Sequence, residues 1–254
     1  YDIMPSLVGS EMCIRDRDIY YSTDGLSGTF QPIVESTEND GNYEWDVDSF
    51  TVSDNYVIRI SSTDTPSISD TSDAVFSVTP PIHFYYVDDA SNADDEYTPG
   101  AIGDDANDGL SPERPKASIR SVLETYDLGE GDVILVDTGT YLSTTNIVIG
   151  TGDAGVEIRG PVGTGHRAVL DRGNTTSGSY VFHLNNADNI AISHLAITGA
   201  EIGIYAGDNS DSDNITISDC EIYSNRENGV YLRPVSYTHL RAHETRHDLV
   251  CRLL

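Results

Sequence analysis

One group of aromatic and polar residues in the C-terminal half of the chain has the spacing of side chains that share one face of a sheet. In the segments 181–184, 202–205 and 229–232, every second residue is a bulky apolar one. Since neighbouring side chains on a strand point to opposite faces, the residues between them point outward. If the three strands lie side by side, their outer face carries the following groups: His183, Asn185, Tyr205, Tyr231 and Arg233.

The residue types on this face suit the binding of a polysaccharide. Aromatic rings stack on the faces of sugar rings, and sugar hydroxyls need hydrogen-bond donors and acceptors. We predict that Tyr205, Tyr231, Asn185 and Arg233 contact such a ligand. The alternative is that outward tyrosine and histidine residues only cover an exposed sheet.

Two residues on outward positions are candidates for catalysis. His183 lies within the polar face, and Asp171 ends the segment AVLD as its most regular outward carboxylate. Hydrolysis of a glycosidic bond uses two carboxylates roughly 5–10 Å apart. The sequence identifies no partner for Asp171, so it leaves the reaction open.

Two acidic loops have the composition of a cation site. The segments DDANDG (104–109) and DNSDSDN (208–214) place carboxylate and amide oxygens at alternate positions. Such oxygens suit Ca²⁺, although neither segment has the full pattern of an EF-hand loop. A solvated acidic loop is the alternative. We predict calcium as the one cofactor, held by the following residues: Asp104, Asp105, Asn107 and Asp108.

The charge of the chain excludes several classes of partner. It has 42 acidic and 14 basic residues among 254, a formal net charge of −28 at pH 7. Nucleic-acid binding needs Lys and Arg contacts to phosphates, so nucleic acid is not an expected partner. No apolar run approaches the roughly 20 residues of a membrane span, so membrane insertion is not expected either. The acidic residues are spread among Asn, Gly, Ser and Thr, which predicts a secreted or cell-surface protein.

Three stretches of different pattern follow one another along the chain. Residues 18–79 contain short alternating strands, DIYYS, NYEWDV, YVIRISS and AVFSV, which predict a β-sandwich. Residues 80–131 include one amphipathic helix, predicted from Pro115 to Leu128 and closed by Gly129. Residues 132–233 consist of short apolar strands separated by Gly, Asn, Asp and Ser.

An internal repeat predicts that these short strands form stacked coils. DNIAIS at 188–193 returns as DNITIS at 213–218, an offset of 25 residues. A period of about 20–30 residues with several strands per unit is typical of a β-solenoid, whose coils bury their apolar rows on one another. We therefore predict parallel strands, with Ile190 beside Ile215 and Ile192 beside Ile217.

A longer motif carries a family resemblance. The segment NDGLSPERPKASIRSVLETYDLGEGDVILVDTGTY (107–141) resembles the start of right-handed parallel β-helix proteins of the pectin-lyase-like class. The resemblance covers residues 83–233. It implies an all-β fold in which an N-terminal helix caps the open end of the β-helix. It says little about the reaction: if the parent protein is an enzyme, the resemblance implies a polysaccharide lyase or glycoside hydrolase, often with calcium and with an active site on later coils.

The N-terminal stretch resembles a second family. DIYYSTDG, GNYEWDV, SDNYVIRISSTD and SDAVFSV are similar to the Ser/Thr-rich, cell-wall-synthesis-type sandwich, an immunoglobulin-like module of secreted proteins. That family has strands before the one that contains Ile19, so residues 18–79 are expected to be a partial sandwich. Trp45 is expected in its core, with sugar stacking as the alternative.

Both ends of the chain resemble a translated sequencing adapter. Residues 6–17 are similar to the translation of a transposase-type library adapter, and residues 235–245 to that of its reverse complement. On this resemblance, residues 1–17 and 234–254 are an artefact and both native termini are cut off. We expect residues 1–17 and 239–254 to pack poorly, whereas residues 235–238 could extend the last strand.

The sequence supports two functions. The first is a secreted or cell-surface fragment that binds or acts on an extracellular polysaccharide, as a lyase or hydrolase would. The second is a non-catalytic surface or adhesion protein that uses sandwich and solenoid as spacer and binding surface. Because no acid–base pair is recognisable, we expect this chain itself to bind without turnover.

Overall fold

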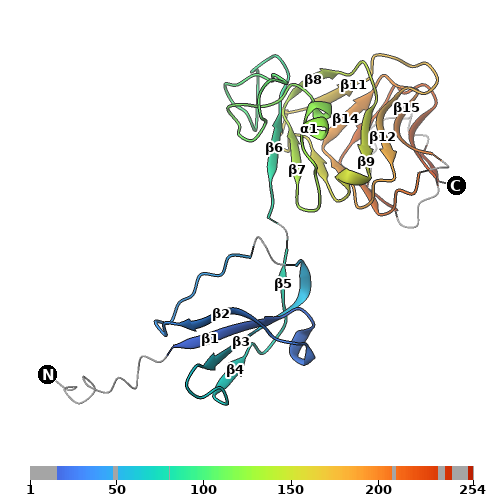
Figure 1. Ribbon diagram of the computed structural model, residues 1–254. Coiled ribbons are helices and arrows are strands. Elements are labelled where there is room, and N and C mark those ends of the chain that lie inside the picture. Colours follow the sequence, from blue (N-terminus) through green and yellow to red (C-terminus); the bar gives the residue numbers. More distant parts are fainter. Residues whose placement is uncertain are drawn as a thin grey trace. The chain divides into compact units, whose positions relative to one another are not determined.

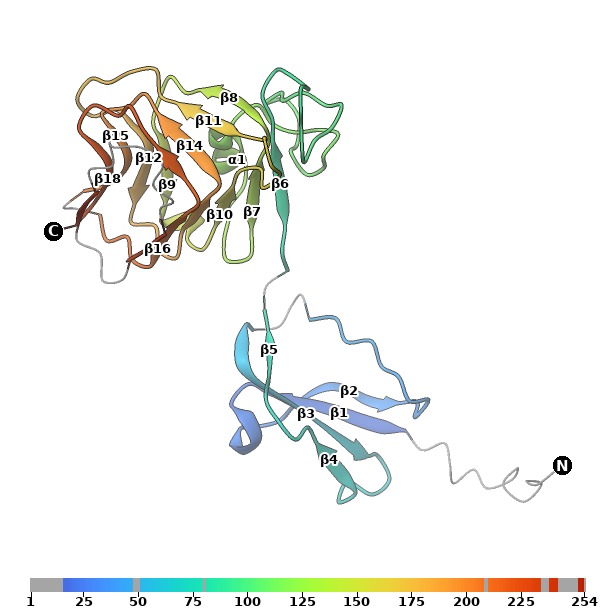
Figure 2. The same cartoon turned by 180° about the vertical axis from the view of Figure 1, so that it is seen from behind.

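The computed structural model describes residues 16–47, 51–79, 81–207 and 210–233, together with the backbone of residues 238–241 and 251–253. The chain divides into two compact units, residues 1–81 and residues 82–254 (Figures 1 and 2). Both units are built from strands, so the fold is all-β, as predicted. In the described part, no helix has the length and apolar character needed to cross a membrane.

The N-terminal unit is an antiparallel sheet in the order β2-β1-β3-β4, with β5 also paired to β3. Its strands are β1 (Arg17–Ser22), β2 (Gln31–Thr37), β3 (Ser53–Ser62), β4 (Ser69–Thr71) and β5 (Phe76–Val78), and a short 3₁₀ helix, η2 (Gly25–Ser27), follows β1. Long β3 pairs with β4 along its second half and with β5 along its first. The residues described here show this one sheet and not the second, facing sheet that a sandwich requires.

Aromatic residues form the centre of this unit. Tyr56 is fully buried, and its ring centroid lies 5.7 Å from that of Tyr21, 5.8 Å from that of Trp45 and 5.8 Å from that of Phe76. Trp45 is half-buried in this cluster, where its ring lies against those of Tyr21, Tyr56 and Phe76. The strand predicted for NYEWDV is wrong, because residues 42–47 have no regular structure. The aromatic contacts hold Trp45 in place without backbone pairing.

The C-terminal unit contains three parallel sheets. The first has the order β19-β16-β13-β10-β7-β6, the second β17-β14-β11-β8 and the third β20-β18-β15-β12-β9. The chain passes through the three sheets in turn, and each passage of three strands is one coil. The arrangement is compatible with a β-helix-like solenoid, and Figure 1 shows the coils following one another from β7 to β18.

The strands of the unit are short and follow one another closely. After β6 (Phe84–Val87), the first coil comprises β7 (Val133–Val136), β8 (Gly139–Leu142) and β9 (Ile147–Gly150), which the 3₁₀ helix η3 (Thr151–Asp153) follows. The later coils comprise β10 (Glu157–Arg159), β11 (Ala168–Asp171), β12 (Tyr180–Asn185), β13 (Ala191–Ser193), β14 (Leu195–Thr198), β15 (Ile202–Ala206), β16 (Ile215–Ser218), β17 (Glu221–Ile222) and β18 (Asn228–Leu232).

Ladders of isoleucine fill the interior of the coils. Ile192 pairs in register with Ile158 on one side and with Ile217 on the other, and all three are buried. The same offset places buried Ile190 beside Ile215. The predicted parallel pairing is therefore confirmed. Since identical side chains lie over one another, each coil buries the apolar row that it could not bury alone.

The turns of successive coils repeat as well. Asn189 and Asn214 both have a positive φ, of 59° and 56°, and the side-chain amide of Asn214 donates to Oδ1 of Asn189 at 2.8 Å. Asparagine tolerates this left-handed conformation better than most residues. His194 and Asp219 also occupy one position of the repeat with positive φ, and their side chains lie 4.0 Å apart. We attribute this pair to the turn.

The helix before the first coil is shorter than predicted. α1 runs from Ile119 to Thr125, because the hydroxyl of Ser118 accepts the N–H of Ser121 at 3.1 Å and caps the helix there. Pro115 does not start it, since the adjacent Lys116 pairs with β6 through Tyr86 and Asp88. The predicted apolar face is confirmed: Ile119 and Val122 are buried in the core, and α1 contacts β6, β7 and β9 at the first coil.

Two strands near the C-terminus continue the parallel sheets. β19 (Thr238–Arg241) pairs with β16, and β20 (Cys251–Leu253) pairs with β18. The backbone of these two segments is thus paired with the sheets, as is that of Arg17, which begins β1, whereas the side chains whose packing would test our expectation for residues 239–254 lie outside the described part. The open edge of a parallel sheet offers unpaired N–H and C=O groups to the chain that follows. Residues 1–15, 234–237, 242–250 and 254 lie outside the described part.

Candidate functional site

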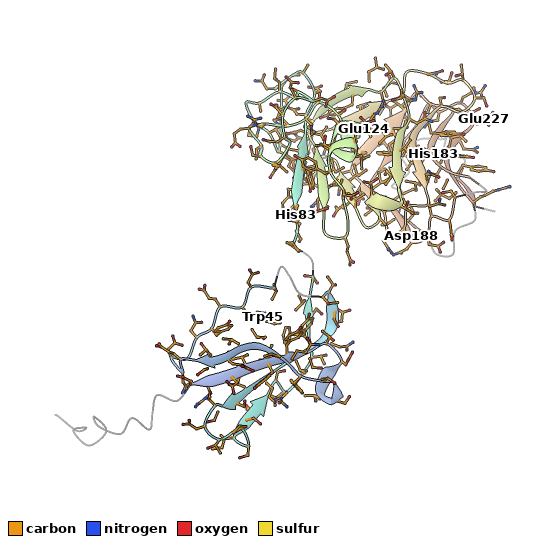
Figure 3. All side chains as sticks on the ribbon, viewed as in Figure 1. Trp45, His83, Glu124, His183, Asp188 and Glu227 are labelled. Carbon is orange, nitrogen blue, oxygen red and sulfur yellow. The ribbon has the colours of Figure 1, made fainter. Side chains whose placement is uncertain are left out.

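The outer face of the β9-β12-β15-β18 sheet carries the predicted polar residues. His183 pairs in register with Tyr205, and Tyr205 pairs with Tyr231, so the three side chains form one row across β12, β15 and β18. Val148 of β9 continues the row beside His183 and is 46% exposed. The predicted arrangement of the three strands is confirmed. In Figure 3, His183 lies between Glu124 of α1 and Glu227, which precedes β18.

The tyrosine rings of this row stack on one another. The ring centroid of Tyr205 lies 4.0 Å from that of Tyr180 and 5.6 Å from that of Tyr231, with interplanar angles of 14° and 15°. Both faces of Tyr205 are therefore covered by protein, which leaves its edge and hydroxyl for a ligand. The prediction that sugar rings stack on the face of Tyr205 does not fit this geometry.

Tyr180 belongs to the stack although the sequence did not reveal it. Strict alternation along β12 would put Tyr180 on the side of Phe182, which is fully buried. As the first residue of the strand, it departs from this alternation and lies over Tyr205. Burial, and then Tyr205, Glu201 and Glu227, raise the pKa of Tyr180 to about 12. Its hydroxyl therefore remains protonated at neutral pH.

The other predicted residues lie around this stack. The His183 ring centroid is 5.5 Å from those of Tyr180 and Tyr205, and burial lowers the pKa of His183, which keeps the imidazole neutral. The guanidinium of Arg233 lies 5.4 Å from the ring centroid of Tyr231. Asn185 is exposed at the end of β12. All five predicted residues thus share one face, on which Asn185 and Arg233 form the margin.

Gly207 provides the space in which the Tyr205 ring lies. A Cβ at this position would come within 2.2 Å of the Tyr205 hydroxyl oxygen. We expect Gly207→Ala to displace the ring and to lower the pKa of Tyr180 from about 12 towards its ordinary value of 10.0. An NMR titration of ¹³C-labelled tyrosine measures this. A Cβ on Gly129 meets nothing within 4 Å, so Gly129→Ala is the control. If the pKa of Tyr180 is unchanged in Gly207→Ala, the stacking of Tyr180 on Tyr205 is contradicted.

Two glutamates and an arginine adjoin the stack. Nη2 of Arg226 donates to the carboxylate of Glu201 and lies 3.3 Å from Oε1 of Glu227. Backbone hydrogen bonds place Ser179, Glu201 and Glu227 at one turn position on successive coils. The sequence could have revealed this pair, because Glu201 and Glu227 each stand directly before a repeated strand, β15 and β18 respectively.

These two glutamates have different environments. The side chain of Glu201 is only 6% exposed, whereas that of Glu227 is 55% exposed. Burial by itself would raise the pKa of Glu201, but the Gly178 N–H, Arg226 and Ser177 together lower it. Glu201 is therefore an ionised, enclosed group that cannot reach a sugar, and Glu227 is the carboxylate open to a ligand.

The two catalytic candidates do not meet. Asp171 ends β11 in the second sheet, where its Oδ1 accepts the N–H of Gly173 at 2.8 Å, and His183 lies on β12 in the third. The exposed carboxylates on either side of His183 in Figure 3 are Glu124 and Glu227, and Glu227 lies 3.3 Å from Nη2 of Arg226. Asp171 and His183 therefore do not form an acid–base pair with each other.

A groove lies next to this face, between α1 and the first coil. It encloses about 560 Å³ and is lined by side chains of α1, β8 and the loop after β8, including Arg120, Glu124 and Thr145. These three residues also line a second hollow of about 520 Å³, which reaches Val148 and Arg172. The row of His183, Tyr205 and Tyr231 thus begins beside a polar hollow at Val148.

The four residues of the predicted calcium loop use their side chains within the fold. Oδ1 of Asp104 accepts the N–H of Ala106 at 2.9 Å, and Oδ1 of Asp105 accepts the N–H of Ala117 at 3.0 Å. Oδ2 of Asp108 lies 3.1 Å from Arg114 Nε, and the amide of Asn107 donates to the Pro115 carbonyl at 2.9 Å.

The cation at the centre of this loop is the chain's single lysine. Lys116 is 3% exposed, and its Nζ donates to the carbonyls of Asp105 and Asn107 at 3.1 and 2.8 Å. Among the described residues, no three His, Cys, Asp or Glu side chains form a complete metal site. The structure therefore does not bring the four residues into one coordination sphere. In the second acidic loop, residues 208 and 209 lie outside the described part.

Comparison with known proteins gives no relative for this chain: no protein-family model, no curated protein and no solved structure matches it.

Proposed function

We propose that the protein binds an extracellular polysaccharide along the outer face of the β9-β12-β15-β18 sheet. The observation that carries the proposal is the in-register row of His183, Tyr205 and Tyr231, with Glu227 and Arg233 beside it. Neighbouring strands are about 4.8 Å apart, so the row offers a polar group at regular intervals to a linear ligand that crosses the strands. The resemblance to pectin-lyase-like right-handed β-helix proteins and to an immunoglobulin-like sandwich of secreted proteins supports the same proposal.

The ligand is bound through hydroxyl edges and not through ring faces. The stacked rings present their phenol groups, which both donate and accept hydrogen bonds, and Asn185, Glu227 and Arg233 add further donors and acceptors. The net charge of −28 opposes an anionic chain. We therefore expect neutral polysaccharides to bind directly, and uronate polymers to bind only where calcium bridges the charges.

Tyr231→Phe tests this mode of binding. The substitution keeps the stack on Tyr205 and removes one hydroxyl, so we expect the affinity for a bound neutral polysaccharide to fall about 5- to 10-fold, as for the loss of one hydrogen bond. Affinity electrophoresis and calorimetry against a panel of neutral and uronate polysaccharides, with and without calcium, measure it.

Tyr223→Phe is the matched control. Tyr223 follows β17 on the second sheet, where Arg167 covers its ring, and the substitution should leave the affinity unchanged. Equal losses of affinity in Tyr223→Phe and Tyr231→Phe would contradict the proposal, as would a wild-type chain that binds no polysaccharide.

A second candidate is a surface or adhesion protein in which this face has no ligand. The stacking of Tyr180, Tyr205 and Tyr231 favours it, because aromatic pairs of this kind stabilise a fold by themselves. The same panel separates the two candidates. Under this alternative, Tyr231→Ala would lower the free energy of unfolding, and neither the wild type nor the variant would bind a polysaccharide.

A further inference from the structure

A second acidic cluster lies where β6 and β7 end. Val87 of β6 and Val136 of β7 pair in register, so the residues that follow them, Asp88 and Asp137, are neighbours. Asp137 accepts the backbone N–H groups of residues 96, 97 and 98 at 2.6–2.7 Å. These bonds fix the segment that follows Asp95 against the ends of the two strands. Glu96, the residue next to Asp95, donates its N–H to Asp137, so Asp95 also lies beside the ends of β6 and β7.

Three carboxylate oxygens of this cluster are buried without a partner. Asp88 is fully buried, and its Oδ1 accepts the N–H of Asp89 at 2.8 Å. Thr98 lies near Asp88, but its hydroxyl donates to Asp137, so Oδ2 of Asp88 has no hydrogen bond of good geometry among the described residues. Both oxygens of Asp95 are likewise shielded from solvent and have no partner in the described part of the chain. Buried carboxylate oxygens are almost always paired, because leaving them unpaired costs free energy.

The cluster has no strong counter-charge among the described residues, since His166 opposes the rise in the pKa of Asp95 but is the smallest of the influences on it. Within the described residues, no lysine or arginine forms an ion pair with Asp88, Asp95 or Asp137. The loop at residues 104–108 shows the contrast, since Lys116 and Arg114 neutralise it and its oxygens are engaged. One acidic segment therefore carries its own cation, and the neighbouring one does not.

We propose that Asp88 and Asp95 bind a divalent cation, Ca²⁺, between the ends of β6 and β7 and the segment that follows them. Hard carboxylate oxygens in a loop are the ligands that Ca²⁺ prefers. Asp137 is a positioning residue, because its oxygens are used by the backbone of residues 96–98 and by Thr98 Oγ1. The described residues contain no set of three side-chain ligands, so the proposal requires water molecules that enter the site together with the ion.

The test compares Asp95→Asn with Asp104→Asn in the full chain. With the wild-type chain, we expect saturating CaCl₂ to raise the melting temperature by about 5 °C or more over excess chelator. Asp95→Asn should abolish this rise and the heat of calcium binding in calorimetry. In chelator, the melting temperature of Asp95→Asn should be no lower than that of the wild type, because the substitution removes a charge that repels the neighbouring carboxylates. Asp104→Asn makes the same change of charge in the Lys116 loop and should respond to calcium as the wild type does.

Three results would overturn the proposal. The first is an equal melting temperature in calcium and in chelator for the wild type, and the second is a calcium response that survives in Asp95→Asn. The third is a response lost only in Asp104→Asn, which would place the site in the other loop. The rival explanation for the unpaired oxygens is that Asp88 and Asp95 share a proton. Burial, and after it the charge of Asp95, raise the pKa of Asp88 to about 7. Stability in chelator would then fall as the pH rises through 7, and calcium would not restore it.

Discussion

Replacing Ile192 with alanine should lower the free energy of unfolding of the C-terminal unit by about 2–5 kcal/mol, the range for deleting a large aliphatic side chain from a core. Ile192 is fully buried and in register with Ile158 and Ile217 on the adjacent coils. The loss removes contacts on both sides of the coil, and the backbone pairing of β13 prevents the neighbours from closing the cavity. Denaturant unfolding followed by circular dichroism measures the change.

Val148→Ala is the control for Ile192→Ala. Val148 also lies on a strand of a parallel sheet, but it points outward and is 46% exposed, so its truncation should change the free energy of unfolding by about 0.5 kcal/mol or less. Equal effects of the two substitutions would mean that the row of isoleucines is not the core of the coils.

Arg226→Ala should lower the free energy of unfolding by about 2–4 kcal/mol at neutral pH. The substitution leaves Glu201, whose side chain is 6% exposed, as a buried charge without its arginine. Loss of one partner from a fully buried pair costs about 3–5 kcal/mol, and the partial exposure of Arg226 reduces this figure. Adding Glu201→Gln to Arg226→Ala should restore much of the stability, because the glutamine still accepts the Gly178 N–H without a charge.

The pH dependence of this effect follows from the lowered pKa of Glu201. A carboxyl whose pKa is lower in the folded chain stabilises the fold above its unfolded pKa, near 4.5, and the contribution is lost as the pH falls through the folded pKa. The difference between wild type and Arg226→Ala should therefore be largest near pH 7 and shrink in acid. Arg167→Ala is the control, since the pair of Arg167 with Glu221 is exposed and is worth about 1 kcal/mol or less. Equal losses in the two variants would show that Glu201 is not effectively buried.

The sequence predicted those features that depend on a local period. The offset of 25 residues between DNIAIS and DNITIS gave the parallel register of β13 with β16, and alternation within the strands gave the row of His183, Tyr205 and Tyr231. Both succeed because the direction of a side chain on a strand follows from its neighbours in sequence. The start of α1 was missed, since Ser118 caps the helix only once Lys116 pairs with Tyr86 and Asp88.

Only the tertiary structure decided which groups meet. The stacking of Tyr180 on Tyr205, the enclosure of Glu201 by Arg226 and the juxtaposition of Asp88 with Asp95 join residues that lie 7 to 25 positions apart. The sequence alone favoured calcium at residues 104–108, and only the folded chain shows that the ammonium of Lys116 donates to two carbonyls of that loop. Periodicity determines the face on which a side chain lies. The turns and the stacking of the coils determine the neighbour it finds there, and hence whether a buried charge is paired.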